Sequence, residues 1–240
     1  MKKSSKLLLT AILILVISLG IYNAALKAEY RKGTYKDPYY GFTSLNLKNF
    51  NTLELNAGSV IGVKIIKGDY QVQVHNLAAE FIKVKQEGQK LKVDVVYPED
   101  RKGVWADYHV VISCPELQSL KTNTEYITKG KSITDKKNSG YKISLEGMSQ
   151  EKLQLNMDNA SRVLLVHNKI NMLEAVAGIS SGSSSELNLA RDNQIQEAHL
   201  DIRNKSQLIL DNLIIPELTY TFSDSARLDM KGSALQLLKK

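Results

Sequence analysis

The sequence predicts an all-β fold, a right-handed parallel β-helix or solenoid of short strands, preceded by one N-terminal transmembrane or signal helix. Three observations predict it. One charge-free apolar run stands near the N-terminus, apolar and polar residues alternate with a period of two through the rest of the chain, and a similar unit recurs in the C-terminal half. Alternation with period two is typical of strands, and a recurring short unit is typical of a solenoid.

The apolar run Leu7–Leu26 contains twenty residues without a charge. A helix of this length, at about 1.5 Å per residue, crosses the roughly 30 Å hydrocarbon layer. A short lysine-containing stretch precedes it, as in signal peptides and signal anchors. The run exceeds the apolar length of most cleaved signals, and the small-residue sites near Ala24 and Ala28 fit cleavage poorly. We therefore predict an uncleaved anchor over residues 1–29, with a cleaved signal as the alternative.

Basic residues flank both ends of this run, so the positive-inside rule does not decide the orientation. A basic start followed by an apolar run is an export pattern, which predicts a bacterial envelope protein with its C-terminal body outside the cytoplasm, in the periplasm. Residues 30–43 are polar, tyrosine-rich and contain Gly33 and Pro38, so they are predicted to form a juxtamembrane linker. Residues 44–240 form the predicted solenoid domain.

The net charge of +7 does not indicate a nucleic-acid partner. Residues 1–36 hold seven basic side chains against one acidic side chain, which leaves a nearly neutral body. A nucleic-acid binder concentrates positive charge on its folded face. The single cysteine, Cys114, excludes an internal disulfide and is expected to be a buried apolar residue of the run Val110–Cys114.

The first half of the body consists of short alternating runs separated by turn signals such as Gly68-Asp69 and Gly88-Gln89. Runs of this length and pattern predict strands, some of them paired as hairpins. The runs are Leu53–Leu55, Val60–Ile66, Tyr70–Val74, Phe81–Lys85 and Leu91–Val95.

The second half repeats a unit made of an alternating run, a short polar turn and a second alternating run. Three units are regular and one, beginning at Leu173, is degenerate. The units begin at Leu153, Leu173, Ala198 and Leu218, and their second runs align on Ser161, Ser185, Ser206 and Ala226, in steps of 24, 21 and 20 residues. A unit this short cannot bury its own apolar side, so we expect successive units to stack about 4.8 Å apart with their strands in parallel register.

These residues resemble the auto-transporter adhesin head, GIN-type, domain family. The resemblance lies in the opening Phe50–Leu55 with Val60–Gly68 behind it, in the strand end Val110–Leu117, and in later turns rich in Ser, Gly and Asn. It covers residues 44 to 235. It implies a β-helical exported or anchored envelope protein without catalytic residues. The family's Ser-Gly-Ser-Gly corners appear here only as Gly182–Ser185.

The sequence contains one pattern of a catalytic serine, Gly178–Gly182, which satisfies G-x-S-x-G. That motif requires a strand, a strained turn and a helix, with acid and histidine partners. Here a β repeat follows the serine, and His199 and Asp201 are alternate neighbours on one predicted strand. We interpret the motif as a solenoid turn and predict a protein that is not an enzyme.

No metal or cofactor site is predicted. His75, His109, His167 and His199 are far apart in sequence and lack metal-ligand spacing, although His167 and His199 fall on nearby coils of a solenoid. A β-helix enzyme acting on carbohydrates would gather carboxylates on one face. The aspartates instead occur singly at predicted turns: Asp158, Asp192, Asp211, Asp224 and Asp229. Trp105 and Tyr108 are expected to pack rather than to hold a sugar ring.

We therefore expect a membrane-anchored binding or structural protein, adhesin-like and non-catalytic, that meets an unknown protein or glycan partner in the envelope. The alternatives are an envelope sensor that acts through a membrane partner and, less favoured, a carbohydrate-active enzyme. Polar capping is absent before the final run Leu235–Lys240, so an open solenoid end is expected to allow homo-oligomers.

Overall fold

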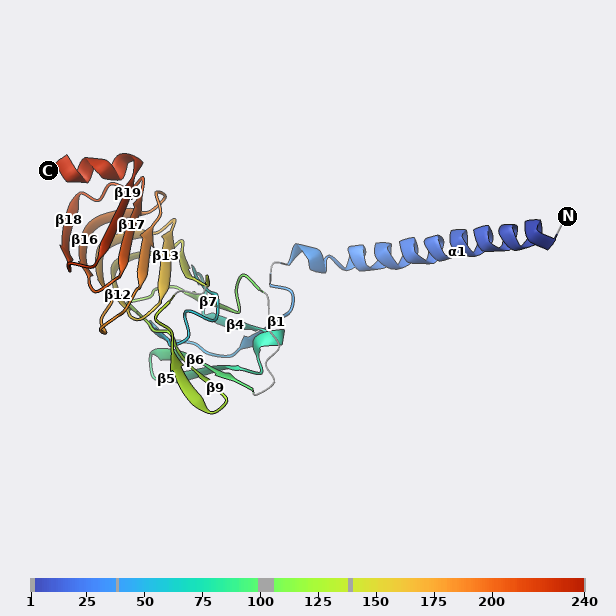
Figure 1. Cartoon of the computed structure of the whole chain (residues 1–240), viewed down its shortest axis with the longest axis horizontal. Coiled ribbons are helices and arrows are strands. Elements are labelled where there is room, and N and C mark those ends of the chain that lie inside the picture. The colour runs from blue at the N-terminus through green and yellow to red at the C-terminus, as the bar shows by residue number, and fades with distance from the viewer. Residues whose placement is uncertain (1–2, 38, 99–105, 138–139, 240) are drawn as a thin grey trace. The chain divides into compact units, whose positions relative to one another are not determined.

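The computed structural model describes residues 3–37, 39–98, 106–137 and 140–239, and divides into two compact units, Met1–Phe42 and Thr43–Lys240 (Figure 1). The first unit contains helix α1 (Lys3–Lys32) and the short 3₁₀ helix η1 (Thr34–Lys36). The mean hydropathy of α1 reaches 2.3, so by length and composition it is able to cross a membrane, a criterion that a signal sequence near the N-terminus also meets.

Helix α1 is longer than predicted. It continues to Lys32, so the residues after position 29 that were assigned to the linker are helical. An ion pair between the side chains of Lys32 and Glu29, three residues apart, lies across the added turn. Pairs at this spacing stabilise a helix, which here extends three residues beyond the predicted boundary at residue 29.

The second unit is built from two large sheets. Sheet A contains, in spatial order, β1 (Phe42–Leu45), β4 (Gln71–His75), β7 (Val110–Cys114), β3 (Val63–Lys67), β11 (Ile143–Glu146), β13 (Arg162–Val166), β15 (Glu186–Leu189), β17 (Gln207–Asp211) and β19 (Arg227–Lys231). Sheet B contains β10 (Lys131–Thr134), β9 (Glu125–Thr128), β6 (Lys90–Tyr97), β2 (Thr52–Leu55), β8 (Ser119–Thr122), β12 (Ser149–Met157), β14 (Lys169–Ala177), β16 (Gln194–Ile202) and β18 (Glu217–Phe222), with β5 (Ile82–Glu87) paired to β6. Two further 3₁₀ helices are η2 (Asn76–Ala78) and η3 (Gly232–Lys239).

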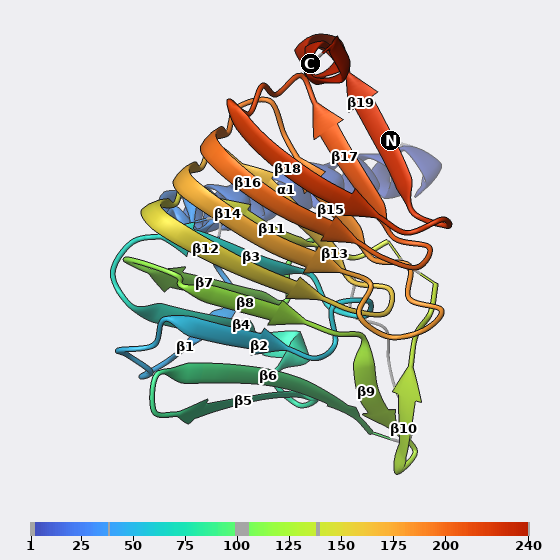
Figure 2. The ribbon, with the colours of Figure 1, turned by 90° about the vertical axis from the view of Figure 1, so that its left-hand side faces the viewer.

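From β11 onward the chain alternates between the two sheets, and each strand pairs in parallel with the strand two places later (Figure 2). In sheet B, Leu153 stands opposite Leu173, Leu173 opposite Ala198, and Ala198 opposite Leu218. The predicted side-by-side register of the repeated units is therefore confirmed, because the four unit starts form one continuous row across sheet B.

The predicted alignment of the second runs is also confirmed. The carbonyls of Ser161, Ser185 and Ser206 accept hydrogen bonds from the backbone N–H groups of Glu186, Gln207 and Arg227, at 2.8, 2.8 and 2.9 Å. Each bond joins one unit to the next at the same point of the repeat. The second runs thus stack as consecutive strands of sheet A.

The first half of the body departs from a purely parallel arrangement, so both sheets are mixed. Strands β4 and β7, β5 and β6, and β9 and β10 pair antiparallel. Two of these pairs are hairpins whose turns contain residues with positive φ, Gly88 in one and Lys129 and Gly130 in the other. Such turns reverse the chain within a few residues and favour antiparallel pairing.

The predicted strand Val60–Ile66 is wrong at its start. Strand β3 begins only at Val63, and Val60 and Ile61 lie buried in a turn. Gly62 explains the break, because a Cβ atom at this position would lie 2.1 Å from the backbone oxygen of Asp107. The chain therefore approaches another segment closely at Gly62 before the strand begins.

The core lies between the two sheets and consists of the inward-facing member of each alternating pair. On β13, for example, Val163 and Leu165 are fully buried while Leu164 faces outward. Cys114 is fully buried in β7, as predicted, and burial raises the pKa of its thiol to about 12.

The last strands are only partly covered. Helix η3 follows β19 and contributes the buried Ala234 and the partly buried Leu237 to the core. Tyr220 of β18 and Leu228 of β19 nevertheless remain 44% and 38% exposed. The prediction of an uncovered solenoid end is therefore wrong where η3 covers the core. At β18 the end is uncovered, as predicted.

Candidate functional site

The outer side of sheet B contains a corner at which its long strands bend. Residues 170 and 173 of β14 are both buried although they are three positions apart, so two consecutive residues, Asn171 and Met172, face outward. The same interruption occurs between Ile195 and Ala198 of β16. In β14, Ile170 and Met172 pair with residues of both neighbouring strands, β12 and β16, whereas Asn171 between them pairs with neither. Such an interruption of the pairing is expected where adjacent strands bend at the same point.

Because each strand presents two adjacent residues at this corner, four neighbouring strand segments line a shared groove of about 430 Å³. We call it the corner groove. Its lining residues come in pairs from β12, β14, β16 and the start of β18: Glu151 and Lys152, Asn171 and Met172, Gln196 and Glu197, Pro216 and Glu217.

The corner groove carries more negative than positive charge. Three carboxylates, those of Glu151, Glu197 and Glu217, line it together with one ammonium group, that of Lys152. The Lys152 Nζ atom lies 2.6 Å from Glu174 Oε1, outside the groove lining. Because Lys152 is already paired there, the groove carboxylates are left without a lining cation of their own.

Hydrogen bonds position several of these side chains. Asn171 Nδ2 donates to Glu151 Oε2 at 2.5 Å, and His199 Nε2 lies 2.7 Å from Glu197 Oε1. The bond from Lys152, and a second from Gln154, lower the pKa of Glu174, so this carboxyl is ionised at neutral pH. The groove therefore offers fixed acceptor oxygens beside the thioether side chain of Met172. Such a surface suits a ligand that carries hydrogen-bond donors or positive charge.

The serine of the G-x-S-x-G pattern, Ser180, is held in a turn. Its hydroxyl donates to Asp158 Oδ2 at 2.5 Å, and its backbone N–H donates to Asp158 Oδ1 at 2.8 Å. Burial acts to raise the pKa of Asp158, but these bonds and those from Asn159 and Ser183 outweigh it and lower the pKa. The hydroxyl is thus a donor to a carboxylate, and His199 bonds to Glu197 instead. This supports the interpretation of the motif as a turn.

The structure places the four histidines in separate environments. His109 is buried and its Nδ1 accepts from the N–H of Gly62 at 3.1 Å. His75 Nδ1 accepts from the N–H of Leu77, while His167 and His199 each contact a carboxylate of their own. Across the described ranges, no three His, Cys, Asp or Glu side chains are grouped closely enough to hold a metal ion.

The aspartates predicted at turns remain dispersed, although Asp211 and Asp229 lie in strands β17 and β19 and the prediction of turns is wrong for these two. Asp158 bonds to Ser180, Asp192 contacts His167, and Asp229 lies 3.4 Å from Lys231 of its own strand. Tyr108 stacks under Lys64, whose Nζ atom lies 5.6 Å from the ring centroid. Trp105 lies outside the described residues.

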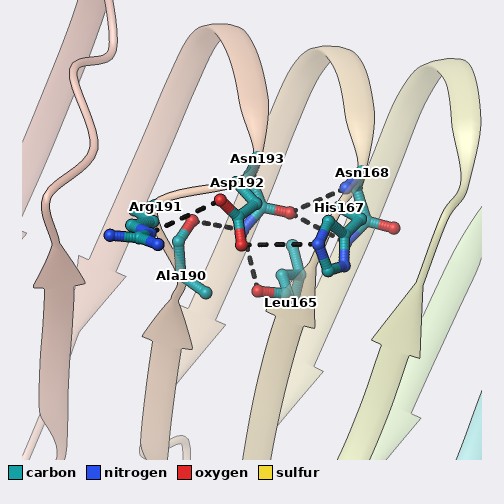
Figure 3. Close-up of polar contacts among 7 residues, drawn as sticks. All are labelled: Leu165, His167, Asn168, Ala190, Arg191, Asp192 and Asn193. Carbon is teal, nitrogen blue, oxygen red and sulfur yellow. Dashed lines mark hydrogen bonds and ion pairs between the residues drawn. The ribbon is translucent and has the colours of Figure 1, made fainter.

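A ladder of buried asparagines lies at a corner between the two sheets (Figure 3). Asn193 Nδ2 donates to the carbonyls of Leu165 and Ala190, both at 2.7 Å, and Asn168 Nδ2 donates to the carbonyl of Leu145 at 2.9 Å. Both asparagines are nearly fully buried. All of these contacts are with the backbone or with each other, so the ladder joins successive units.

Sequence reasoning missed the corner groove, although a signal was present. An apolar pair three residues apart, Ile-x-x-Leu or Ile-x-x-Ala, recurs at residues 170–173, 195–198 and 215–218; both members are buried in the first two, and Leu218 of the third is partly buried. Strict alternation would have made one of the two intervening residues inward-facing. The recurrence of this exception at the same point of each unit is the pattern that predicts two adjacent outward residues in every coil.

Comparison with known proteins gives only distant likenesses, since no protein-family model and no curated protein matches the chain. The solved structures that resemble it include a proposed adhesin from Bacteroides fragilis, with 11% identity, a TM-score of 0.47, and coverage of 80% of this chain and 93% of that one. A proposed adhesin from Parabacteroides merdae has 12% identity, a TM-score of 0.33 and coverage of 80% and 95%. A proposed lipid-binding protein from Parabacteroides distasonis has 12% identity, a TM-score of 0.34 and coverage of 80% and 94%. Because these TM-scores are below 0.5, we assign neither family nor activity from them.

Proposed function

We propose that this chain is a membrane-anchored, extracytoplasmic binding protein of the bacterial envelope, non-catalytic and adhesin-like, whose ligand surface is the corner groove. The observation that carries the proposal is the groove itself, which crosses four consecutive hydrogen-bonded strands. A site on paired strands is pre-organised, so little ordering cost opposes binding. The fold class that we propose for the body is a right-handed parallel β-helix of the GIN type, with antiparallel additions in its first half.

The proposed anchor is α1. Its charge-free run Leu7–Leu26 follows a lysine-containing start, and none of its described side chains is buried. Apolar side chains in this number are stable only in a nonpolar environment.

The proposed ligand class follows from the charge of the groove. The excess of carboxylates over cations favours a partner with exposed amino or guanidinium groups, such as a basic peptide segment or an amino sugar. Neutral acceptors on Asn171 and Gln196 add hydrogen-bonding capacity next to the carboxylates. An anionic polysaccharide would meet like charges here and is disfavoured.

The ligand test compares binding of lysine- or arginine-rich peptides and of chitosan oligosaccharides to the full chain in detergent. We expect the double variant Glu197→Gln/Glu217→Gln to weaken binding at least tenfold. The matched control, Asp211→Asn/Asp229→Asn, removes the same charge from sheet A and is expected to leave binding unchanged. Equal weakening by both variants would indicate a general charge effect and would contradict a site at the groove.

The location test is protease accessibility. In intact spheroplasts of an expressing bacterium, added protease is expected to digest the body, and the protein is expected to stay with the membrane after high-salt washing. Digestion only after lysis would place the body in the cytoplasm. Release of the body into the soluble fraction would favour the cleaved signal.

A further inference from the structure

Strand β18 is an open edge of sheet B. It pairs with β16 on one side, and within the described part of the chain its other side has no strand partner. The N–H of Ser223 donates to the carbonyl of Ile202 in β16 at 3.0 Å. Because successive residues of a strand present their backbone groups to opposite sides, those of Leu218, Tyr220 and Phe222 face the open edge.

The corresponding edge of sheet A is protected. Strand β19 carries three charged residues in five positions, Arg227, Asp229 and Lys231, and η3 packs against it and against β17. Charges and covering segments are the usual means by which proteins block edge-to-edge pairing. In contrast, the segment Leu218–Ser223 contains neither a charge nor a proline. The fold therefore protects one terminal edge and leaves the other open.

The exposed segment is symmetric about its centre. It reads Leu-Thr-Tyr-Thr-Phe from Leu218 to Phe222, with an apolar residue at each end, threonines next, and Tyr220 in the middle. We propose that β18 pairs antiparallel with β18 of a second copy of this chain, about a two-fold axis at Tyr220. The shared surface is the same patch on both copies, as a two-fold dimer requires.

This register satisfies both the side chains and the backbone. It sets Leu218 opposite Phe222 of the second copy and threonine opposite threonine, while Glu217 meets the neutral Ser223. The residues whose backbone groups face the open edge become the hydrogen-bonded pairs, giving on the order of six new backbone bonds. Pairing of β19 about its own centre would instead set Asp229 against Asp229, and like charges directly opposite destabilise a sheet.

The same pairing covers apolar surface at the end of the body. Leu218, Tyr220 and Phe222 continue the inward rows of sheet B, whose earlier members Leu200 and Ile202 are 3% and 0% exposed. Tyr220 is 44% exposed because none of the described strands lies beyond it. A second copy supplies that strand.

The test is the mass of the full chain in detergent, measured by light scattering from about 1 to about 100 µM. We expect a monomer–dimer equilibrium for the wild type and at least tenfold weaker association for Tyr220→Lys and for Tyr220→Glu, since each variant sets two like charges together. Mixing the two variants is expected to restore the dimer. The control Leu228→Lys places the same charge at a similarly exposed site on β19 and is expected to keep the wild-type equilibrium.

Each other outcome overturns the proposal. A wild-type monomer at every concentration shows that the edge does not pair. A dimer that persists in Tyr220→Lys is held by another surface, such as α1. A second measurement tests the register: Thr219→Cys/Thr221→Cys places thiols opposite each other across the axis and should give disulfide-linked dimers under mild oxidation. The control Arg227→Cys/Asp229→Cys, with equally many thiols on β19, should not.

Discussion

Asn193 Oδ1 accepts two hydrogen bonds from Asn168, one from the backbone N–H at 3.0 Å and one from Nδ2 at 2.9 Å. The two residues belong to successive units, 25 positions apart, so a single side-chain oxygen satisfies donors of the preceding unit. Figure 3 shows that this contact lies in the corner where the chain passes between the sheets. The asparagine side chains thus satisfy backbone hydrogen-bonding groups that are buried away from water.

Replacement of Asn193 tests the strength of this contact. We expect Asn193→Ala to lower the free energy of unfolding by about 1–3 kcal/mol, because it removes the acceptor of the buried backbone N–H of Asn168 and the side-chain donor to the carbonyls of Leu165 and Ala190. Urea denaturation followed by circular dichroism measures the change. Asn188→Ala, on the outward side of β15, is the control and should cost less than about 0.5 kcal/mol. Equal losses would show that the ladder contributes nothing particular.

Substitution of Gly178 and of Gly182, two glycines of the same connection, distinguishes the cost of a steric clash from the cost of backbone strain. Both have positive φ, 87° at Gly178 and 75° at Gly182. A Cβ atom at Gly178 would lie 2.3 Å from the carbonyl oxygen of Arg203, whereas nothing lies within 4 Å of one at Gly182. We expect Gly182→Ala to cost about 1 kcal/mol and Gly178→Ala markedly more. Thermal denaturation measures the difference. Equal melting temperatures of the two variants would contradict this geometry.

Neighbouring leucines on β13 test the assignment of the core face. Leu165 is fully buried and Leu164 faces outward. We expect Leu165→Ala to destabilise the body by about 2–5 kcal/mol, because it leaves a cavity, and Leu164→Ala to cost less than about 1 kcal/mol. The comparison is made by chemical denaturation. The reverse order would require β13 to be turned over in the sheet.

The hydrogen bonds on Asp158 predict a loss of stability in acid. Its pKa is lowered in the folded state, so its stabilising contribution is present above the unfolded pKa and is lost as the pH falls through the folded pKa. We expect Ser180→Ala to reduce stability at neutral pH and to converge with the wild type once the pH has fallen below the folded pKa of Asp158. Nuclear magnetic resonance titration should show the pKa of Asp158 higher in the variant. An unchanged pKa would mean that Ser180 does not hold the carboxylate.

The single thiol reports opening of the core. Burial raises the pKa of Cys114 to about 12, and its side chain is fully buried. A thiol of this kind is unreactive because the thiolate is the nucleophile. We expect negligible reaction with a disulfide reagent at pH 8 in the native protein and rapid reaction in urea. Fast labelling of the native protein would contradict the position of β7 in the core.

Much of the body could be predicted from its sequence because stacking imposes a periodic requirement. Every inward position within the strands of the repeated units must be apolar, and the strands from Leu153 to Met230 meet this requirement, while the buried serines and asparagines lie in the connections between strands. The first half was less predictable. Whether two adjacent alternating runs pair in parallel or antiparallel depends on turn geometry, such as the positive φ of Lys129 and Gly130, which alternation does not reveal.

The site was the least predictable part. Familiar catalytic and metal-binding motifs do not include the corner groove, which depends on where alternation fails. Residues such as Glu197 and Glu217 are unremarkable singly, and they become neighbours only because β16 and β18 pair in register. A groove of this kind is a property of stacking rather than of a local motif.

The parallel register of the second half makes the length of the protein adjustable. Since residues 186–206 make one complete circuit through both sheets, an in-frame duplication of that segment would add one layer of about 4.8 Å and leave both ends chemically unchanged. Growth by whole circuits would also extend the corner groove by two lining residues at a time. Insertion of whole circuits would thus lengthen the body and its groove in discrete increments without redesign of the core.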